Sequence, residues 1–161
     1  MFISRSPLQR SIWIYSTDNV KMSRSVLVLF GSGPGIGISV AKAFARQYFD
    51  VIAICSRDAK RLQSEQAEIA AAAKEAGRDV QVIAVPTDLT DLNQLERTLQ
   101  AVQALGPLGC VYHNAARINY EQPLTTSSKD VEEDFRVRCR TLLLVVFNAD
   151  PLARPATFRS M

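Results

Sequence analysis

Residues 30–37 have the sequence FGSGPGIG and stand between two different apolar patterns. The run before them, residues 25–30 (SVLVLF), is nearly continuous in apolar side chains, which is typical of a strand buried on both faces. After them, Ile36, Val40 and Phe44 recur at intervals of four, which predicts a helix with one apolar face. A glycine-rich turn between a strand and a helix predicts a phosphate-binding loop, because the N–H groups and the positive dipole end of the helix face an anion.

The glycines of this loop have separate expected roles. Gly31 can make a sharp turn off the strand, since glycine tolerates positive φ. Gly35 lacks a side chain and lets the backbone approach a pyrophosphate, and Gly37 lets the helix pack closely on the sheet. Taken alone, the GxxxGxG spacing fits a purely structural turn equally well, and the strand-to-helix setting favours binding. The predicted loop residues are Gly31, Ser32, Gly33, Gly35, Ile36 and Gly37.

The alternation of strand and helix continues along the chain. Apolar runs at 51–55, 80–85 and 110–112 predict further strands. A helix is expected over 57–76, with Leu62, Ile69, Ala73 and Ala76 on its apolar side and Gly77 as a left-handed cap. Asp91 can N-cap a helix whose apolar positions are Leu92, Leu95, Leu99 and Val102.

A last helix is expected to begin at Ser128 or Asp130, with Val131, Phe135, Leu142 and Val146 facing inward. The whole pattern predicts an α/β fold, a Rossmann-like doubly wound parallel sheet that is incomplete, with about four strands in the order 3-2-1-4. We expect a flexible leader at 1–21, a nucleotide-binding domain at 22–147 and an irregular tail at 148–161.

Composition excludes several classes of protein. The chain has 161 residues, 47% of them hydrophobic, and a net charge of only +3, which argues against nucleic-acid binding. The single His and the widely spaced Cys55, Cys110 and Cys139 predict no metal site and suit buried, unpaired thiols in a reducing compartment such as the cytoplasm. No apolar run reaches the roughly 20 residues that would span a membrane. The basic, Ser-bearing leader fits either a disordered segment or a mitochondrial targeting segment.

Four stretches in order resemble the short-chain dehydrogenases/reductases. The glycine loop resembles their TGxxxGxG cofactor loop, with Phe30 in place of the usual Thr. The other stretches are CSRD (55–58) after the second strand, DLTD (88–91) after the third, and HNAA (113–116), which resembles the family's NNAG, after the fourth. The resemblance covers roughly residues 25–146 and implies a dinucleotide cofactor.

The end of the second strand bears on the choice of cofactor. A carboxylate there would bind the ribose hydroxyls of NAD, and this chain has Ser56 followed by Arg57. A guanidinium can hold a 2′-phosphate through paired hydrogen bonds, which favours NADP over NAD. The alternative is that Arg57 only stands at a helix start, paired with Asp58.

The resemblance also implies roles for residues after the third and fourth strands. Asp88 is similar to an adenine-contacting Asp, with Leu89 lining the ring pocket, although a DLTD turn at a helix start is the alternative. Asn114 is similar to the Asn that steadies the end of the fourth strand, and Ala115 and Ala116 leave room for the nicotinamide ribose. His113 is interpreted as a structural residue.

The family's catalytic pair is not found in this chain. The resemblance implies a YxxxK motif, but Tyr15, Tyr48, Tyr112 and Tyr120 have no Lys at +4, and no lysine follows Lys129. No catalytic residue is therefore assigned, and the family's catalytic Ser also has no counterpart. Arg138 stands where the family has an active-site Asn, so it either points into the cleft or is solvated on a rotated helix.

These observations suggest a truncated front half of such an enzyme. The expected function is NADP(H) binding without independent catalysis, and the alternative is a non-enzymatic dinucleotide sensor or interaction subunit. An active enzyme built on His113, Asp88 and Arg138 has the least support. The fourth strand would form an exposed apolar edge, and we expect the chain to form homo-oligomers or to bind a partner protein through it.

Overall fold

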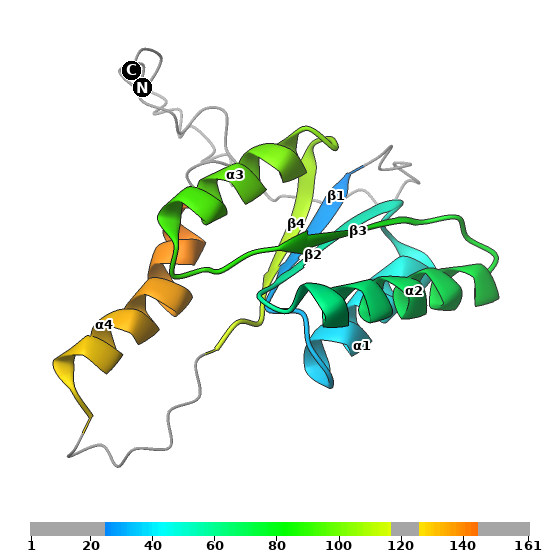
Figure 1. Cartoon of the computed structure of the whole chain (residues 1–161). Coiled ribbons are helices and arrows are strands. Elements are labelled where there is room, and N and C mark those ends of the chain that lie inside the picture. Colours follow the sequence, from blue (N-terminus) through cyan, green and yellow to red (C-terminus); the bar gives the residue numbers. More distant parts are fainter. Residues whose placement is uncertain (1–24, 117–125, 145–161) are drawn as a thin grey trace, which may run out of the picture.

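The computed structural model describes residues 25–116 and 126–144. The predicted leader (1–21) and tail (148–161) lie outside these residues. Four strands form one parallel sheet in the order β3-β2-β1-β4, as predicted (Figure 1). Their bounds are Val26–Phe30 (β1), Val51–Ser56 (β2), Gln81–Pro86 (β3) and Leu108–His113 (β4).

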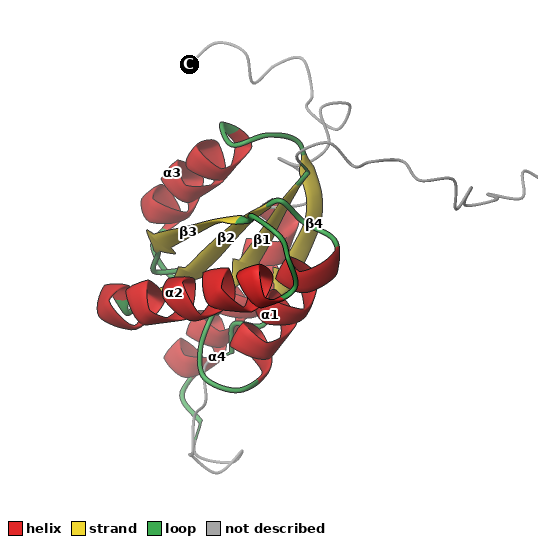
Figure 2. Ribbon diagram, turned by 90° about the vertical axis from the view of Figure 1, so that its right-hand side faces the viewer, coloured by secondary structure: helices red, strands yellow, loops and turns green. Residues whose placement is uncertain are grey.

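Helices cover both faces of this sheet (Figure 2). The helices α1 (Ile36–Gln47) and α2 (Ala59–Glu75) pack on one face, against a cluster that includes Leu27 and Ile52. The helix α3 (Leu92–Gln103) packs on the other, against a cluster that includes Val28. Successive residues of β1 and β2 enter different clusters, and this confirms that these strands are buried on both sides.

The predicted helix boundaries are close to those observed. Asp91 caps α3 and its side chain accepts hydrogen bonds from the N–H groups of Asn93 and Gln94. Gly77 follows α2 with a φ of 73°, as expected of a left-handed cap. The helix α4 (Ser128–Phe135) begins at the first of the two expected residues, and the π-helix η1 (Arg136–Arg140) follows it directly.

The predicted apolar side of α1 is only partly right, since Phe44 does pack against the core. The residues that face the sheet are Gly37, Ala41 and Ala45, whereas Ile36 is 65% exposed. The physical reason is close packing, because small residues let the helix approach the sheet. Ala76 and Leu92 were also predicted on the apolar sides of their helices, and both are exposed at a helix end.

The predicted inward face of the last helix is also wrong. Val131, Phe135 and Leu142 are exposed, and Val137 and Thr141 are the buried residues. Val137 and Thr141 are four residues apart across η1, so this side of the segment faces the sheet. Val146, the remaining predicted position, lies outside the described residues.

Candidate dinucleotide-binding site

The glycine loop leaves β1 in a turn that is anchored to the neighbouring strand. The N–H groups of Gly31 and Ser32 both donate to the carbonyl oxygen of Cys55, over 2.8 and 3.0 Å. Gly31 has a φ of 87°, a conformation that favours glycine. The sharp turn expected at Gly31 is therefore present.

The same glycine is in contact with the end of β4. A Cβ on Gly31 would lie 2.4 Å from the backbone nitrogen of Ala115, which leaves no room for a side chain. Asn114 donates from its backbone to the carbonyl oxygen of Phe30 (2.8 Å) and from Nδ2 to that of Gly31 (3.1 Å). The loop and the strand end are thus in close contact, and Asn114 joins them through two hydrogen bonds.

The other two glycines of the motif lie in opposite surroundings. Gly37 is buried, and a Cβ there would lie 3.1 Å from the carbonyl oxygen of Gly31. Gly35 precedes α1 with a φ of 96°, and a Cβ there would meet nothing within 4 Å. Exposed Ile36 follows it. The N–H of Ile38 already donates to the carbonyl oxygen of Gly33, over 3.2 Å. The N–H groups of Ile36 and Gly37 precede the intrahelical hydrogen bonds of α1, so this end of the helix offers these two donors to an anion.

Arg57, the predicted phosphate ligand, is exposed directly after β2. Among the described residues, no ion pair or hydrogen bond engages its guanidinium. The carboxylate of Asp58 instead accepts from the N–H of Arg61 and lies 3.9 Å from its Nη1. The alternative pairing of Arg57 with Asp58 is therefore not the one observed.

Arg61 is a site residue that the sequence reasoning missed. Its Nη2 donates to the carbonyl oxygen of Ser32 at 3.3 Å and to Oγ of Ser56 at 3.4 Å. The side chain thus bridges the glycine loop and the end of β2. A spacing signal existed, because Arg57 and Arg61 are four residues apart at the start of a predicted helix.

Asp88 and Leu89 are held within the turn that precedes α3. Oδ1 of Asp88 accepts from the N–H and the hydroxyl of Thr90, over 2.9 and 2.8 Å. Leu89 is buried in the core next to β1. The DLTD stretch therefore forms a turn at the start of a helix, which is the second of the two interpretations given above. Ala115 is half-buried and Ala116 exposed beside the loop.

His113 joins β4 to η1. A carbonyl only accepts hydrogen bonds, so Nε2 of the imidazole donates to the carbonyl oxygen of Val137, over 3.1 Å. Partial burial lowers the pKa of His113, and the bond to Val137 opposes part of this effect. Arg138 is exposed, which is the solvated one of its two alternatives.

The cysteine thiols differ in burial and in reactivity. Burial raises the pKa of the Cys55 thiol to about 12, so this group is inert, but Cys139 is exposed and not buried as expected. No helix within the described ranges is long and apolar enough to cross a membrane. Residues 25–116 and 126–144 contain no cluster of three potential metal ligands.

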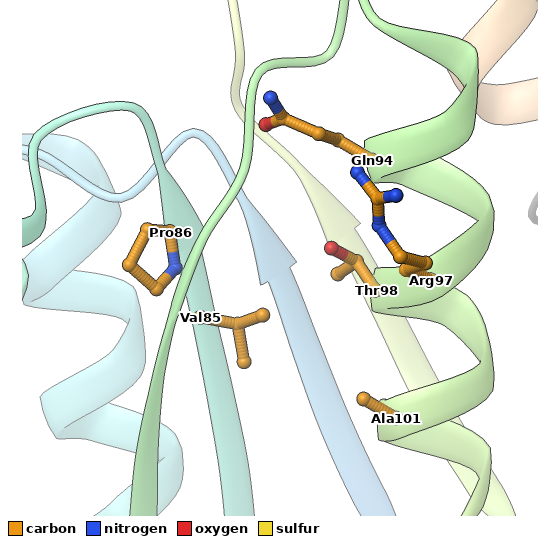
Figure 3. A pocket seen from close by; sticks show the side chains of 6 residues that line it. All are labelled: Val85, Pro86, Gln94, Arg97, Thr98 and Ala101. Carbon is orange, nitrogen blue, oxygen red and sulfur yellow. The ribbon is translucent and has the colours of Figure 1, made fainter.

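An open hollow of about 400 Å³ lies between β3 and α3 (Figure 3). Its lining contains none of the predicted cofactor residues. It consists of Val85, Pro86, Gln94, Arg97, Thr98 and Ala101.

A parallel sheet in this order, with a glycine loop between its first strand and helix, defines the class of Rossmann-like nucleotide-binding folds. Residues 25–151 match the family described as short chain dehydrogenase, and the chain belongs to that family. No curated protein matches the chain as a sequence relative.

Solved structures of other proteins share this fold. The short-chain dehydrogenase from Sphingobium yanoikuyae, in complex with NADPH, is 22% identical with a TM-score of 0.68, over 80% of this chain and 48% of that one. The L-sorbose reductase from Gluconobacter frateurii, complexed with NADPH and L-sorbose, is 20% identical with a TM-score of 0.67, over 81% and 48%. The NADH-dependent reductase A1-R′, complexed with NAD, is 19% identical with a TM-score of 0.64, over 80% and 52%. The chain thus spans about half the length of these structures.

Proposed function

We propose that this chain is the NADP(H)-binding Rossmann domain of a short-chain dehydrogenase/reductase-like oxidoreductase. The observation that carries the proposal is the glycine loop, in which Gly31 packs on Ala115 while Gly35 leaves the start of α1 open. Such a loop presents N–H donors to a diphosphate. The predicted cofactor contacts are Gly31, Ser32, Gly33, Gly35, Ile36, Gly37, Arg57, Asp88, Leu89, Asn114, Ala115 and Ala116.

The preference for NADP rests on charge at the end of β2. Ser56 stands where a carboxylate would repel a 2′-phosphate, and exposed Arg57 follows it. Arg61 also reaches Ser56, but its guanidinium is engaged by Glu65 and by the carbonyl oxygen of Ser32, so we assign the preference to Arg57. Two of the three structures compared above hold NADPH and the third holds NAD, so the relatives support a pyridine dinucleotide in general.

Independent catalysis is not part of this proposal, because the 161 residues contain no YxxxK motif. A non-enzymatic sensor or interaction subunit is the second candidate, since it would keep the loop and lack the chemistry. An assay of carbonyl reduction with NADPH tests whether the chain alone is inert.

We also propose an association behaviour and a cellular compartment for the chain. The exposed side of α4 and the edge strand β4 support self-association or a partner protein. The unpaired thiols fit a reducing compartment such as the cytoplasm.

The direct experiment is a titration of the purified chain with NADPH and with NADH, followed by nucleotide fluorescence. We expect saturable binding of both, with NADPH the tighter. Folded protein that binds neither nucleotide at millimolar concentration would refute the proposed function.

A further inference from the structure

A buried acidic residue lies behind the glycine loop and has no role in the function proposed above. Glu65 belongs to the buried side of α2, together with Leu62 and Ile69, and only 3% of its surface is exposed. A carboxylate at such a position is destabilising unless hydrogen bonds and an opposite charge compensate it. Its partners therefore explain why it is there.

Both carboxylate oxygens are directed to groups that hold the loop. Oε2 accepts a buried hydrogen bond of 2.5 Å from the hydroxyl of Ser32. Oε1 lies 3.3 Å from Nε of Arg61 and accepts no hydrogen bond from any described residue. The ion pair with Arg61 is therefore what offsets the charge of Glu65.

Arg61 connects back to the same loop residue. Its Nη2 donates to the carbonyl oxygen of Ser32, so α2 holds both the side chain and the backbone of that serine. Ser32 is itself 3% exposed and directly follows the turn at Gly31. Fixing Ser32 therefore fixes the path of the backbone that leads to Gly35.

We propose that Glu65 is a positioning residue for dinucleotide binding, which acts through Ser32 and Arg61 to hold the loop in its binding conformation. The inference rests on the proposed function, namely that this loop binds the diphosphate of a dinucleotide. A preformed loop binds more tightly because no ordering cost arises on binding. NADPH and NADH share the diphosphate, so Glu65 affects both nucleotides equally.

The test compares four variants of the full chain, Glu65→Ala, Ser32→Ala, the double variant and Gln66→Ala, in titrations with NADPH and with NADH. Circular dichroism at the titration temperature verifies that each is folded. Gln66 is a matched control, since its Nε2 donates to the carbonyl oxygen of Val82 at 2.6 Å, a hydrogen bond that joins α2 to β3 and not to the loop.

We expect Glu65→Ala and Ser32→Ala each to weaken nucleotide binding about tenfold, by the same factor for NADPH as for NADH. The ratio of NADPH to NADH affinity stays unchanged. The double variant binds no more weakly than Glu65→Ala, because Glu65→Ala already removes the acceptor of the Ser32 hydroxyl together with the partner of Arg61. Gln66→Ala lowers the melting temperature and retains the affinity of the wild type.

Several outcomes overturn the inference. It is contradicted if Glu65→Ala and Ser32→Ala fold and bind both nucleotides as tightly as the wild type. It is also contradicted if the fold-loss of affinity in the double variant equals the product of the fold-losses in the two single variants. An equal loss in Gln66→Ala would reduce the effect to general stability. If Glu65→Ala does not fold, Ser32→Ala decides alone, since it removes one hydroxyl. A wild-type chain that binds neither nucleotide overturns the proposed function itself and is thereby distinguished from these results.

Discussion

Gly31 and Gly35 both have positive φ, yet they differ in what a side chain would meet. A Cβ on Gly31 would collide with backbone that no rotamer change can move, whereas one on Gly35 would enter open space. The first glycine is required by the packing of the loop on β4. The second is required by its own backbone conformation and, in the proposed function, by the ligand.

Replacement of these glycines by alanine should separate the two roles. We expect Gly31→Ala to lower the free energy of unfolding by about 3 kcal/mol or more, because backbone strain and overpacking add. Gly35→Ala should cost about 1–2 kcal/mol from strain alone, and the folded protein should lose most of its nucleotide affinity. Urea unfolding and nucleotide titration measure the two effects. Equal losses of stability in the two variants would contradict the interpretation.

Arg57 is the residue on which the choice of cofactor rests. We expect Arg57→Ala to weaken NADPH binding about tenfold, the effect of one charge-assisted hydrogen bond, with NADH binding nearly unchanged. Arg46→Ala is the control, because Arg46 is an exposed arginine paired with Glu75 at the far end of α1. Parallel titrations of both variants check this. NADPH binding that is insensitive to Arg57→Ala would contradict this assignment.

Among the elements, a hydrogen bond connects the sheet to the last helical segment. His113 at the end of β4 donates to the carbonyl oxygen of Val137 in the π-helix η1. Arg140 of the same segment donates to the carbonyl oxygen of Thr90. These bonds and buried Val137 determine which side of the segment faces the sheet.

The lowered pKa of His113 gives this link a pH dependence. In the unfolded chain this histidine takes up a proton near pH 6.5, whereas in the folded chain it does so only at lower pH. The free energy of unfolding therefore decreases as the pH falls through 6.5. We expect the wild type to lose more melting temperature between pH 7.5 and 5.5 than His113→Gln, which keeps a donor and does not titrate. Identical pH profiles of the two proteins would contradict this.

Considered as a whole, the described part of the molecule has four large apolar side chains exposed along one helical segment. Val131, Phe135, Leu142 and Leu143 are between 43% and 58% exposed on the segment from α4 onward. The strand β4 is also an edge of the sheet, paired only with β1 among the described strands. Such surfaces favour association between molecules.

We therefore expect the chain to form oligomers at micromolar concentration. The double variant Phe135→Glu/Leu142→Glu should shift it toward the monomer, because it places charge on this surface. Leu92→Glu is the control, since Leu92 is an exposed leucine on a different helix. Light scattering with size-exclusion chromatography measures the masses. A monomeric wild type would contradict the expectation.

The sequence alone was enough to predict the order of the elements, the parallel sheet 3-2-1-4 and the turn at Gly31. These depend on local periodicity, on glycine and capping chemistry, and on the handedness of strand–helix–strand connections. Each of these is a property of short segments, and so it is visible before folding.

Only the tertiary structure decided which sides of α1 and α4 face the sheet, and that Arg61 and Glu65 hold Ser32. The packed side of a helix depends on how closely it approaches its neighbour, so Ala41 and Ala45 are buried while Ile36 is exposed. Glu65 stands 33 residues from Ser32, and a charged residue within a helix gives no sign of a partner that folding brings to it from another segment.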